Sequence, residues 1–503
     1  MLIDGLSLKQ IFSREEYPLP VATNPINLGK SGLSNKSPQP KKASISHSIS
    51  QKWTLFVVLF VALLSGGLGA GLAFVLSSRP FQQSQLSADE SSVFNKNADD
   101  MTSAIAGIPT LTRPVNILLL GTIVLTSDLP NAQPAERGVA LDQVEGNLNG
   151  MSDAMLLIRF DPETQKVAVL SIPRDSRVDI KGVGRTKINF ANYAGGAALS
   201  AQTVSEVLGD IPIDRYIRFN VGGFGQLVDA LGGVELYVPK RMKYQDDSQR
   251  LYINLNAGTQ FLDGNKSIQY MRFRHDDLGD IGRVQRQQAF FRAFIEQKLK
   301  PETIAKLPQV MSILKDNIDT NLSVEEILAL AGYASKVDRK NVQMHMAPGR
   351  FSNPGEFDNL SYWILDNRRL ATIMSQSFGV MKQASGNTLD NSPEYLRVAI
   401  QDSMSQPEGS RRATTVLSKA GYGQVFAASE RWSKPLAKTQ IIAQGGDLES
   451  AQKLRDTLGV GEVLIESTGE LESDITVRVG KDWLQANRIP LKPATKANPS
   501  RPQ

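Results

Sequence analysis

Residues 154–172 read AMLLIRFDPETQKVAVLSI, two almost continuous apolar runs on either side of a turn. The runs 154–160 and 166–172 have the length and composition of buried strands, and Asp161-Pro162 marks the turn between them. Strands without polar alternation are typical of sheets buried on both faces. The stretch therefore predicts the centre of a sheet that helices cover on both sides.

Strands and helices alternate around this stretch from about residue 114 to residue 300. Further strands are predicted at 116–121, 216–221, 234–238 and 267–274, and helices at 195–209, 222–233 and 284–299. Another helix and a strand near 342–346 continue the pattern to about residue 390. This order predicts an α/β fold, with a mixed sheet in a three-layer α/β/α arrangement.

A second, smaller α/β domain is predicted at 391–485, where strands such as YLRVAIQD and DITVRVG alternate with helices such as LESAQKLRDTLG. Residues 1–52 and 486–503 are rich in Pro, Ser and Lys and are predicted to be disordered tails. Residues 77–113 read as a polar linker.

Residues 53–76, WTLFVVLFVALLSGGLGAGLAFVL, carry no charge and predict a single transmembrane helix. A secretory signal would begin near the first residue, and a core helix of this length would have a polar face. Lysines precede the run and acidic residues follow it. The positive-inside rule then places the N-terminus in the cytoplasm and the later domains outside it.

Composition excludes several classes of site. The chain of 503 residues has no cysteine and three histidines, so thiolate catalysis, disulfides and a histidine-based zinc site are not expected. The net charge of +5 is spread along the chain and does not demand a nucleic-acid partner.

Arginines gather in 271–288, MRFRHDDLGDIGRVQRQQ. On the predicted strand Arg272 and Arg274 share a face, and on the following helix Arg283 and Gln287 share a side. Arginine pairs suit adjacent phosphates, because the planar guanidinium binds phosphate oxygens in a bidentate way. Surface salt bridges with Asp276, Asp277 and Asp280 are the alternative explanation.

A second motif favours the anion site. SIPRDSRV places Arg174 and Asp175 just after a buried strand, where ligands bind in open α/β sheets. Asp153 lies at the start of the neighbouring strand, and carboxylates there suit a hard cation. A turn or capping role is the alternative for Asp153.

The same motifs, in the same order, resemble the LytR-CpsA-Psr (LCP) family. The resemblance covers NILLLGT, SDAMLLIRFDPETQKVAVLSIPRDSRV, KIN, DALGGVELYVPK and QYMRFRHDDLGDIGRVQRQQ, within residues 114–300 of an LCP domain at 114–390. Residues 391–485 resemble the LytR C-terminal module of such proteins, and two segments, LTSDLP and MKYQDDSQRLYINL, look most like cyanobacterial members.

The resemblance implies a membrane-anchored, Mg²⁺-dependent phosphotransferase. Such enzymes move a glycopolymer from a polyprenyl-pyrophosphate donor to a peptidoglycan acceptor, which implies an inner-membrane protein with periplasmic domains and a lipid partner. By motif, the residues expected to bind the pyrophosphate are Arg174, Arg272, Arg274, Arg283 and Gln287. Asp280 would order these arginines, with Arg174, Asp280 and Arg283 forming the catalytic set, and Asp153 would hold the metal.

The metal site departs from the family pattern at one position. Many members have an Asp directly after the first-strand GT, where this chain has Ile123. Either Asp128 supplies the missing ligand, or the metal has one protein carboxylate fewer.

Two other functions remain open from the sequence. The same arginines suit a non-catalytic binder of anionic envelope glycans or polyprenyl phosphates, or a polyprenyl-pyrophosphate hydrolase. A transcriptional regulator is not supported, since no helix-turn-helix is evident and the globular part is expected to lie across the membrane from DNA.

Overall fold

The structure is a computed structural model of the whole chain, and the residues that it describes belong to one compact unit, Leu68–Gln503. The described residues are 86–94, 101–105, 108–123, 148–247, 251–273, 279–298, 300, 310, 317–338, 341–357, 360–380, 392–428, 431–432, 434–470 and 473–490. Residues 1–52 and 491–503 of the expected tails, the expected membrane span at 53–76 and Asp128 lie outside these residues, whereas residues 486–490 are described and Ile489 packs against the core of the smaller domain. Among the described residues, no helix has the length and apolar character needed to cross a membrane.

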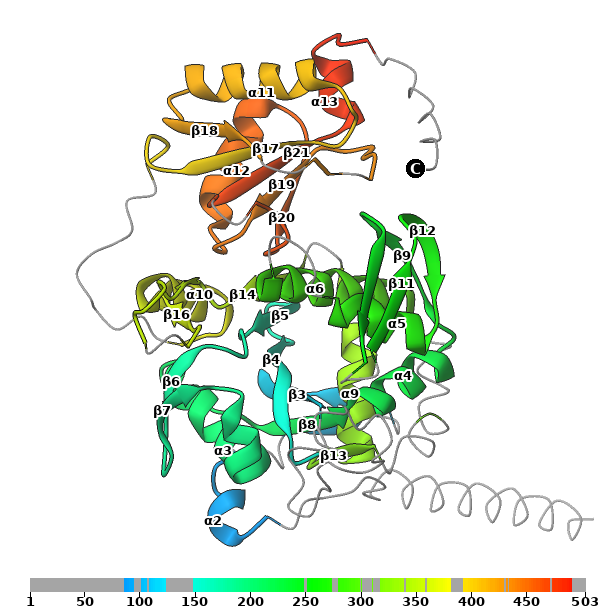
Figure 1. Cartoon of the computed structure of the whole chain (residues 1–503), viewed down its shortest axis with the longest axis vertical. Helices are drawn as coiled ribbons and strands as arrows, with labels where there is room; N and C mark the ends of the chain where they lie inside the picture. Colours follow the sequence, from blue (N-terminus) through cyan, green and yellow to red (C-terminus); the bar gives the residue numbers. More distant parts are fainter. Residues whose placement is uncertain are drawn as a thin grey trace, which may run out of the picture. The chain divides into compact units, whose positions relative to one another are not determined.

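A six-stranded mixed sheet forms the larger domain (Figure 1). Its strands, in spatial order, are β13 (Ile318–Thr320), β8 (Arg215–Asn220), β3 (Val115–Ile123), β4 (Met151–Asp161), β5 (Lys166–Ser171) and β14 (Val342–Met346). The pairs β3–β8 and β5–β14 are parallel, whereas β13–β8, β3–β4 and β4–β5 are antiparallel. The predicted mixed sheet is therefore confirmed, and the predicted strand at 342–346 has the bounds expected.

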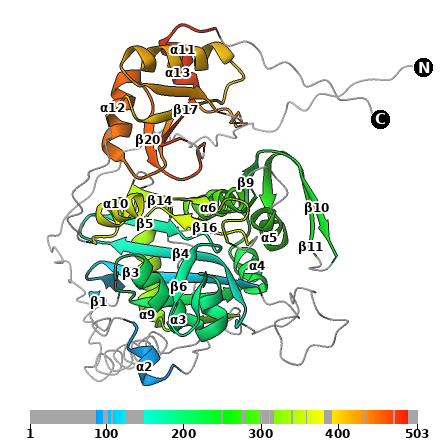
Figure 2. The same ribbon diagram turned by 60° about the vertical axis from the view of Figure 1, so that its left-hand side comes forward.

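Helices cover both faces of this sheet because alternate residues of each central strand point to opposite sides. On one face Leu118 and Leu157 pack with α3 (Phe190–Val207) and α10 (Asn367–Ser377). On the other face Leu156 packs with α6 (Gly279–Lys298) and α9 (Val324–Ala334). Figure 2 shows β3, β4 and β5 one beside the next in this sheet.

The turn between β4 and β5 is closed by a side chain from α9. The Tyr333 hydroxyl donates to the carbonyl of Asp161 at 2.6 Å and lies 3.2 Å from that of Lys166. Gln165 takes a left-handed conformation with φ 56°, which lets the chain reverse. The register that follows pairs Asp161 with Lys166 and Leu156 with Ser171.

One predicted strand is wrong. Residues 264–272 form helix α5 (Gly264–Arg272), so Arg272 does not lie on a strand and does not alternate with Arg274. The Asp263 carboxylate caps this helix by accepting from the Lys266 N–H at 2.8 Å. The buried residues of α5 recur at helical spacing, with Ser267 and Tyr270 three apart, and this burial decides the conformation.

Short elements surround the sheet. They are helices α2 (Ala88–Ser91) and α4 (Val221–Ala230), and the two-stranded pairs β1 (Thr102–Ile105) with β2 (Ile108–Leu111), β6 (Arg177–Ile180) with β7 (Gly184–Lys187), β9 (Val234–Val238) with β12 (Gly258–Leu262), β10 (Met242–Asp246) with β11 (Leu251–Leu255), and β15 (Gly349–Phe351) with β16 (Trp363–Leu365).

A separate five-stranded mixed sheet forms the smaller domain. Its order is β18 (Gln424–Ala427), β17 (Arg397–Asp402), β21 (Ile475–Val479), β19 (Gln440–Ala443) and β20 (Glu462–Ile465). Its helices are α11 (Pro407–Lys419), α12 (Leu448–Leu458) and α13 (Lys481–Ala486). Leu417 and Leu454 pack with the strands in its own core, so the expected second α/β fold is present.

His345 on β14 gives the fold a predictable pH dependence. It is fully buried, and neither ring nitrogen has a hydrogen-bond partner. Burial lowers the pKa of His345 to about 4, from 6.5. Between these values the unfolded chain binds a proton that the folded chain does not, so stability falls as the pH falls from 6.5 towards 4.

We therefore expect the His345→Leu variant to lose part of the acid sensitivity of the parent chain. From pH 6.5 to pH 5 this histidine alone should lower the free energy of unfolding by about 2 kcal/mol. Urea denaturation of both proteins at the two pH values measures the difference. Equal pH dependence of the two proteins would show that His345 titrates normally in the folded state.

Candidate functional site

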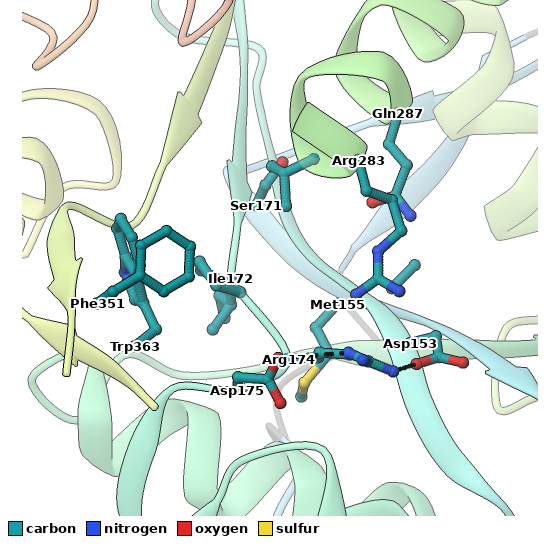
Figure 3. A pocket seen from close by; sticks show the side chains of 13 residues that line it. Asp153, Met155, Ser171, Ile172, Arg174, Asp175, Arg283, Gln287, Phe351 and Trp363 are labelled. Atoms are coloured by element: carbon teal, nitrogen blue, oxygen red, sulfur yellow. Dashed lines mark hydrogen bonds and ion pairs between the residues drawn. The ribbon is translucent and has the colours of Figure 1, made fainter. Parts of the chain in front are cut away.

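A pocket lies beyond the end of β5, where β4 begins and α6 passes over the sheet. Its lining residues come from four places in the chain, and they are Asp153, Ala154, Met155, Ser171, Ile172, Pro173, Arg174, Asp175, Arg283, Val284, Gln287, Phe351 and Trp363. Figure 3 shows Arg283 and Gln287 coming from α6 on one side and Phe351 and Trp363 on another. Side chains from distant parts of the sequence thus meet at one end of the central strands.

Asp153 and Arg174 meet where the β4–β5 ladder ends. Its last pair is Leu156 with Ser171, which brings the start of β4 and the turn after β5 to the same edge of the sheet. The Arg174 guanidinium donates to Asp153 Oδ1, and its Nε lies 3.5 Å from Asp175 Oδ2 (Figure 3). About a fifth of each side chain of the Asp153–Arg174 pair remains exposed.

Lys187 adds a second cation on the far side of Asp175. Its Nζ lies 2.7 Å from Asp175 Oδ1. Asp175 is therefore held between Arg174 and Lys187. Lys187 comes from β7, which follows the β6 strand that begins two residues after Asp175. The sequence prediction missed this lysine, although its place in the RTKIN segment offered a signal.

Helix α6 supplies the other cationic wall of the pocket. Arg283 and Gln287, one helical turn apart, both line it, and only 6% of Arg283 is exposed. Gln288 holds this helix in place, because its amide donates to Ser171 Oγ at 3.2 Å and to the His345 carbonyl at 3.0 Å. The helix is thus fixed to the ends of two neighbouring strands.

Arg286 points elsewhere. Its guanidinium donates to the carbonyl of Phe273 and lies 5.3 Å from the centre of the Phe273 ring. It therefore fixes the residue that follows α5. Burial raises the pKa of the neighbouring Tyr270 to about 12, although the charge of Arg286 acts in the opposite direction.

Four of the predicted site residues meet in the pocket: Asp153, Arg174, Arg283 and Gln287. Arg272 ends α5 and is not among the described residues that line the pocket. Arg274 and Asp128 lie outside the described residues, and of Asp280 only the backbone, in the first turn of α6, is described. Ile123 ends β3 and its backbone pairs with Met151.

The pocket suits a small anion by charge and hydrogen bonding, but its free volume is about 10 Å³, roughly the space of one water. A diphosphate can enter only if the arginine side chains move. Among the described residues, no group of three or more His, Asp or Glu side chains is placed to hold a metal ion. Asp153 and Asp175 are hard oxygen ligands, and Mg²⁺ commonly uses one or two such carboxylates together with substrate phosphate and water. The residues present are compatible with that mode.

Comparison with known proteins gives two family matches. Residues 79–378 match the LytR_cpsA_psr family, and residues 395–483 match the family described as LytR cell envelope-related transcriptional attenuator.

Several curated proteins are similar to the first region. The polyisoprenyl-teichoic acid–peptidoglycan teichoic acid transferase TagU of Oceanobacillus iheyensis is 32% identical over 281 residues, which are 54% of this chain and 77% of that protein. The similarly named TagV of Bacillus subtilis is 34% identical over 198 residues, 37% of this chain and 50% of that protein. The crystal structure of B. subtilis TagV aligns at 27% identity with a TM-score of 0.43, over 52% of this chain and 95% of that one.

Gln288 offers a test of how α6 is held. We expect Gln288→Leu to lower the free energy of unfolding by about 2 kcal/mol or more, because three hydrogen bonds are lost, to Ser171, His345 and the Ser467 N–H, and buried polar groups lose their partner. Gln202→Leu is the matched control, since Gln202 bonds only Glu206 at the surface among the contacts described. It should change stability by less than about 0.5 kcal/mol. Equal effects in urea denaturation would contradict the anchoring role.

Proposed function

The chain belongs to the LytR-CpsA-Psr family, and we propose that it is a membrane-anchored phosphotransferase that moves a glycopolymer from a polyprenyl-pyrophosphate carrier to peptidoglycan. The observation that carries this proposal is the meeting of Arg174, Arg283, Gln287 and Asp153 in one pocket. The names of the similar transferases support a polyisoprenyl-linked polymer as donor and peptidoglycan as acceptor.

In the proposed reaction, a sugar hydroxyl of the acceptor attacks the phosphorus nearest the donor glycan. A new phosphorus–oxygen bond forms to the acceptor, and the bond to polyprenyl phosphate breaks. The hydroxyl proton leaves, and Asp175 is the candidate to accept it among the two carboxylates that line the pocket, because Asp153 is the proposed metal ligand. The chain forms no covalent bond with the substrate, so positioning and charge neutralisation carry the catalysis.

Arg283 is the group best placed for charge neutralisation. Its side chain is almost fully buried on a helix that Gln288 fixes to the sheet. A buried guanidinium interacts strongly with developing phosphate charge, because little water screens it. Gln287 adds an amide donor from the same face of α6. The helix that carries both groups is fixed before the substrate arrives, which limits the reorganisation needed during the reaction.

Arg174 has a different role because its guanidinium already contacts Asp153. We propose that Arg174 turns from Asp153 to the pyrophosphate when the donor binds. This exchange makes room in a pocket whose free volume is about 10 Å³. It also leaves the Asp153 carboxylate without its arginine partner when the negatively charged pyrophosphate enters the pocket.

The Asp153 carboxylate would then hold Mg²⁺. Asp128 is the proposed second ligand, because this chain has Ile123 where many family members have an aspartate. The metal would offset the negative charge that grows on the phosphate oxygens. We also propose that Arg272, Arg274 and Asp280 contribute to donor binding, as their motif implies.

A transfer assay tests the proposal. The purified chain is given a polyprenyl-pyrophosphate-linked glycan, peptidoglycan and Mg²⁺, and glycan bound to peptidoglycan is measured. We expect Arg283→Ala to lower kcat/KM about 100-fold or more, the usual cost of losing one fixed charge-stabilising donor. Arg283→Lys should recover only part of the rate, since lysine keeps the charge without the planar pair of donors.

Arg185→Ala is the matched control in that assay. Arg185 lies on β7 with a largely exposed side chain, 3.9 Å from Asp179, and does not line the pocket. Transfer that is unchanged in Arg283→Ala would rule out the assigned site. Donor retention without turnover would instead favour a non-catalytic binder, and release of glycan phosphate without acceptor would favour a hydrolase.

We propose an inner-membrane location, with the N-terminus in the cytoplasm and both α/β domains outside it. The uncharged run at 53–76 and the lysines before it support this orientation. A reporter that is active only outside the cytoplasm, fused after residue 490, should be active, and the same reporter fused after residue 45 should be silent. The reverse pattern would place the pocket in the cytoplasm and contradict the proposal.

A further inference from the structure

An exposed aromatic side chain lies at the rim of this charged pocket. Phe351 on β15 lines the pocket together with Arg174 and Arg283, and 47% of its surface is exposed. Its partner across the β15–β16 pair is Trp363, and the two rings meet edge to face with centroids 5.2 Å apart. We call Phe351 and Trp363 the aromatic pair.

The two rings differ in how they are held. Trp363 is 5% exposed and donates its indole N–H to the Ala347 carbonyl at 3.1 Å, so it is an anchor. It packs with Val284, the residue after Arg283, in one buried cluster. Phe351 rests against this anchor and keeps a large part of its own surface open. The buried Trp363 side chain therefore supports the Phe351 ring, and part of the Phe351 surface stays exposed.

The aromatic pair is also tied directly to the loop that carries Arg174. The backbone N–H of Trp363 donates to the carbonyl of Asp175 at 2.9 Å, and Trp363 forms a parallel bridge with Ser176. Trp363 is thus fixed to the chain neighbours of both Arg174 and Arg283. The aromatic pair lines the same pocket as these two arginines, so it forms one wall for a group bound there.

Other aromatic residues of the same segment are already occupied. The Arg177 guanidinium lies 4.1 Å from the centre of the Phe357 ring and 5.6 Å from that of Tyr362. The Arg350–Glu356 ion pair, at 2.9 Å, closes the loop that joins β15 and β16. These contacts hold the segment in place, whereas the exposed face of Phe351 is not used by any of them.

We infer that Phe351, supported by Trp363, binds the donor sugar that is attached to the pyrophosphate. This inference rests on the proposed function, because it assumes a glycan-linked diphosphate in the pocket. That sugar is covalently bonded to the phosphate, so it lies at the pocket rim whenever the phosphates lie between Arg174 and Arg283. One face of a pyranose ring exposes C–H groups, which the negative face of an aromatic ring attracts. Arg283 and Gln287 make the α6 side polar, which leaves the aromatic side for this apolar face.

The test compares two soluble ligands by calorimetry. One is a short-chain prenyl pyrophosphate carrying a disaccharide, and the other is the same prenyl pyrophosphate without sugar. For the full-length chain in detergent, we expect the glycosylated ligand to bind about tenfold more tightly. Phe351→Ala should remove this difference and leave the affinity for the sugar-free ligand unchanged.

Three further variants show whether the aromatic ring is the cause. Phe351→Trp should keep the preference for the glycosylated ligand, whereas Phe351→Leu, which is apolar but has no ring, should lose most of it. Phe261→Ala is the matched control, since Phe261 on β12 is 58% exposed and does not line the pocket. It should behave like the parent chain.

Several outcomes would overturn the inference. One is equal binding of the two ligands by the parent chain, another is an equal loss of both affinities in Phe351→Ala, and a third is a raised KM for peptidoglycan alone. A parent chain that prefers the glycosylated ligand but shows no turnover would contradict the proposed transfer reaction and not the sugar site. In that case the chain binds the donor without transferring its glycan.

Discussion

The antiparallel register of β4 and β5 is the constraint on which the site depends. The ladder ends with Leu156 paired to Ser171, so Asp153, near the start of β4, and Arg174, in the turn after β5, come to the same edge of the sheet. A slip by one residue would turn the side chains of one strand to the opposite face relative to its partner. The two faces pack against different helices, so such a slip would disturb the packing of both cores. The packing of the two strands therefore sets the strand end at which the ion pair forms.

Much of this arrangement follows from the sequence. The strands around 154–172 and helix α6 were predictable, because continuous apolar runs and helical spacing leave few alternatives. The contact between Asp153 and Arg174 was not predicted, because Asp153 lies at a register shift of β4 and Arg174 in the turn after β5, where strand pairing gives no guide. The strand predicted for 267–274 is wrong, because the cap at Asp263 and the burial of Tyr270 favour a helix there. Local alternation of arginines was a weaker signal than burial.

The aromatic pair was not predictable in the same way. Phe351 and Trp363 lie far along the chain from Arg174, and no local pattern in their segment indicates a pocket. Their position depends on tertiary contacts: the backbone bond from Trp363 to Asp175 and the packing of Trp363 on Val284. Such contacts arise only when the strands and α6 are already in place. Residues that tertiary contacts bring to a pocket can therefore be identified only from a structure. Residues of a motif within one strand or helix can be identified from the sequence.

The contacts around the pocket divide into a permanent and an exchangeable set. Gln288, Trp363 and the β4–β5 ladder join α6, β15–β16 and β4 to the ends of the neighbouring strands β5 and β14, and the side-chain bonds are buried. Breaking these bonds leaves polar groups without partners in the interior, which is costly. The Arg174–Asp153 pair is partly exposed, and an ion pair in contact with water contributes little net stability. An incoming anion can therefore replace Asp153 as the partner of Arg174 at small cost, while the surrounding frame keeps Arg283 and Phe351 where they are. A site with this division can be closed without a ligand and still be organised to receive one.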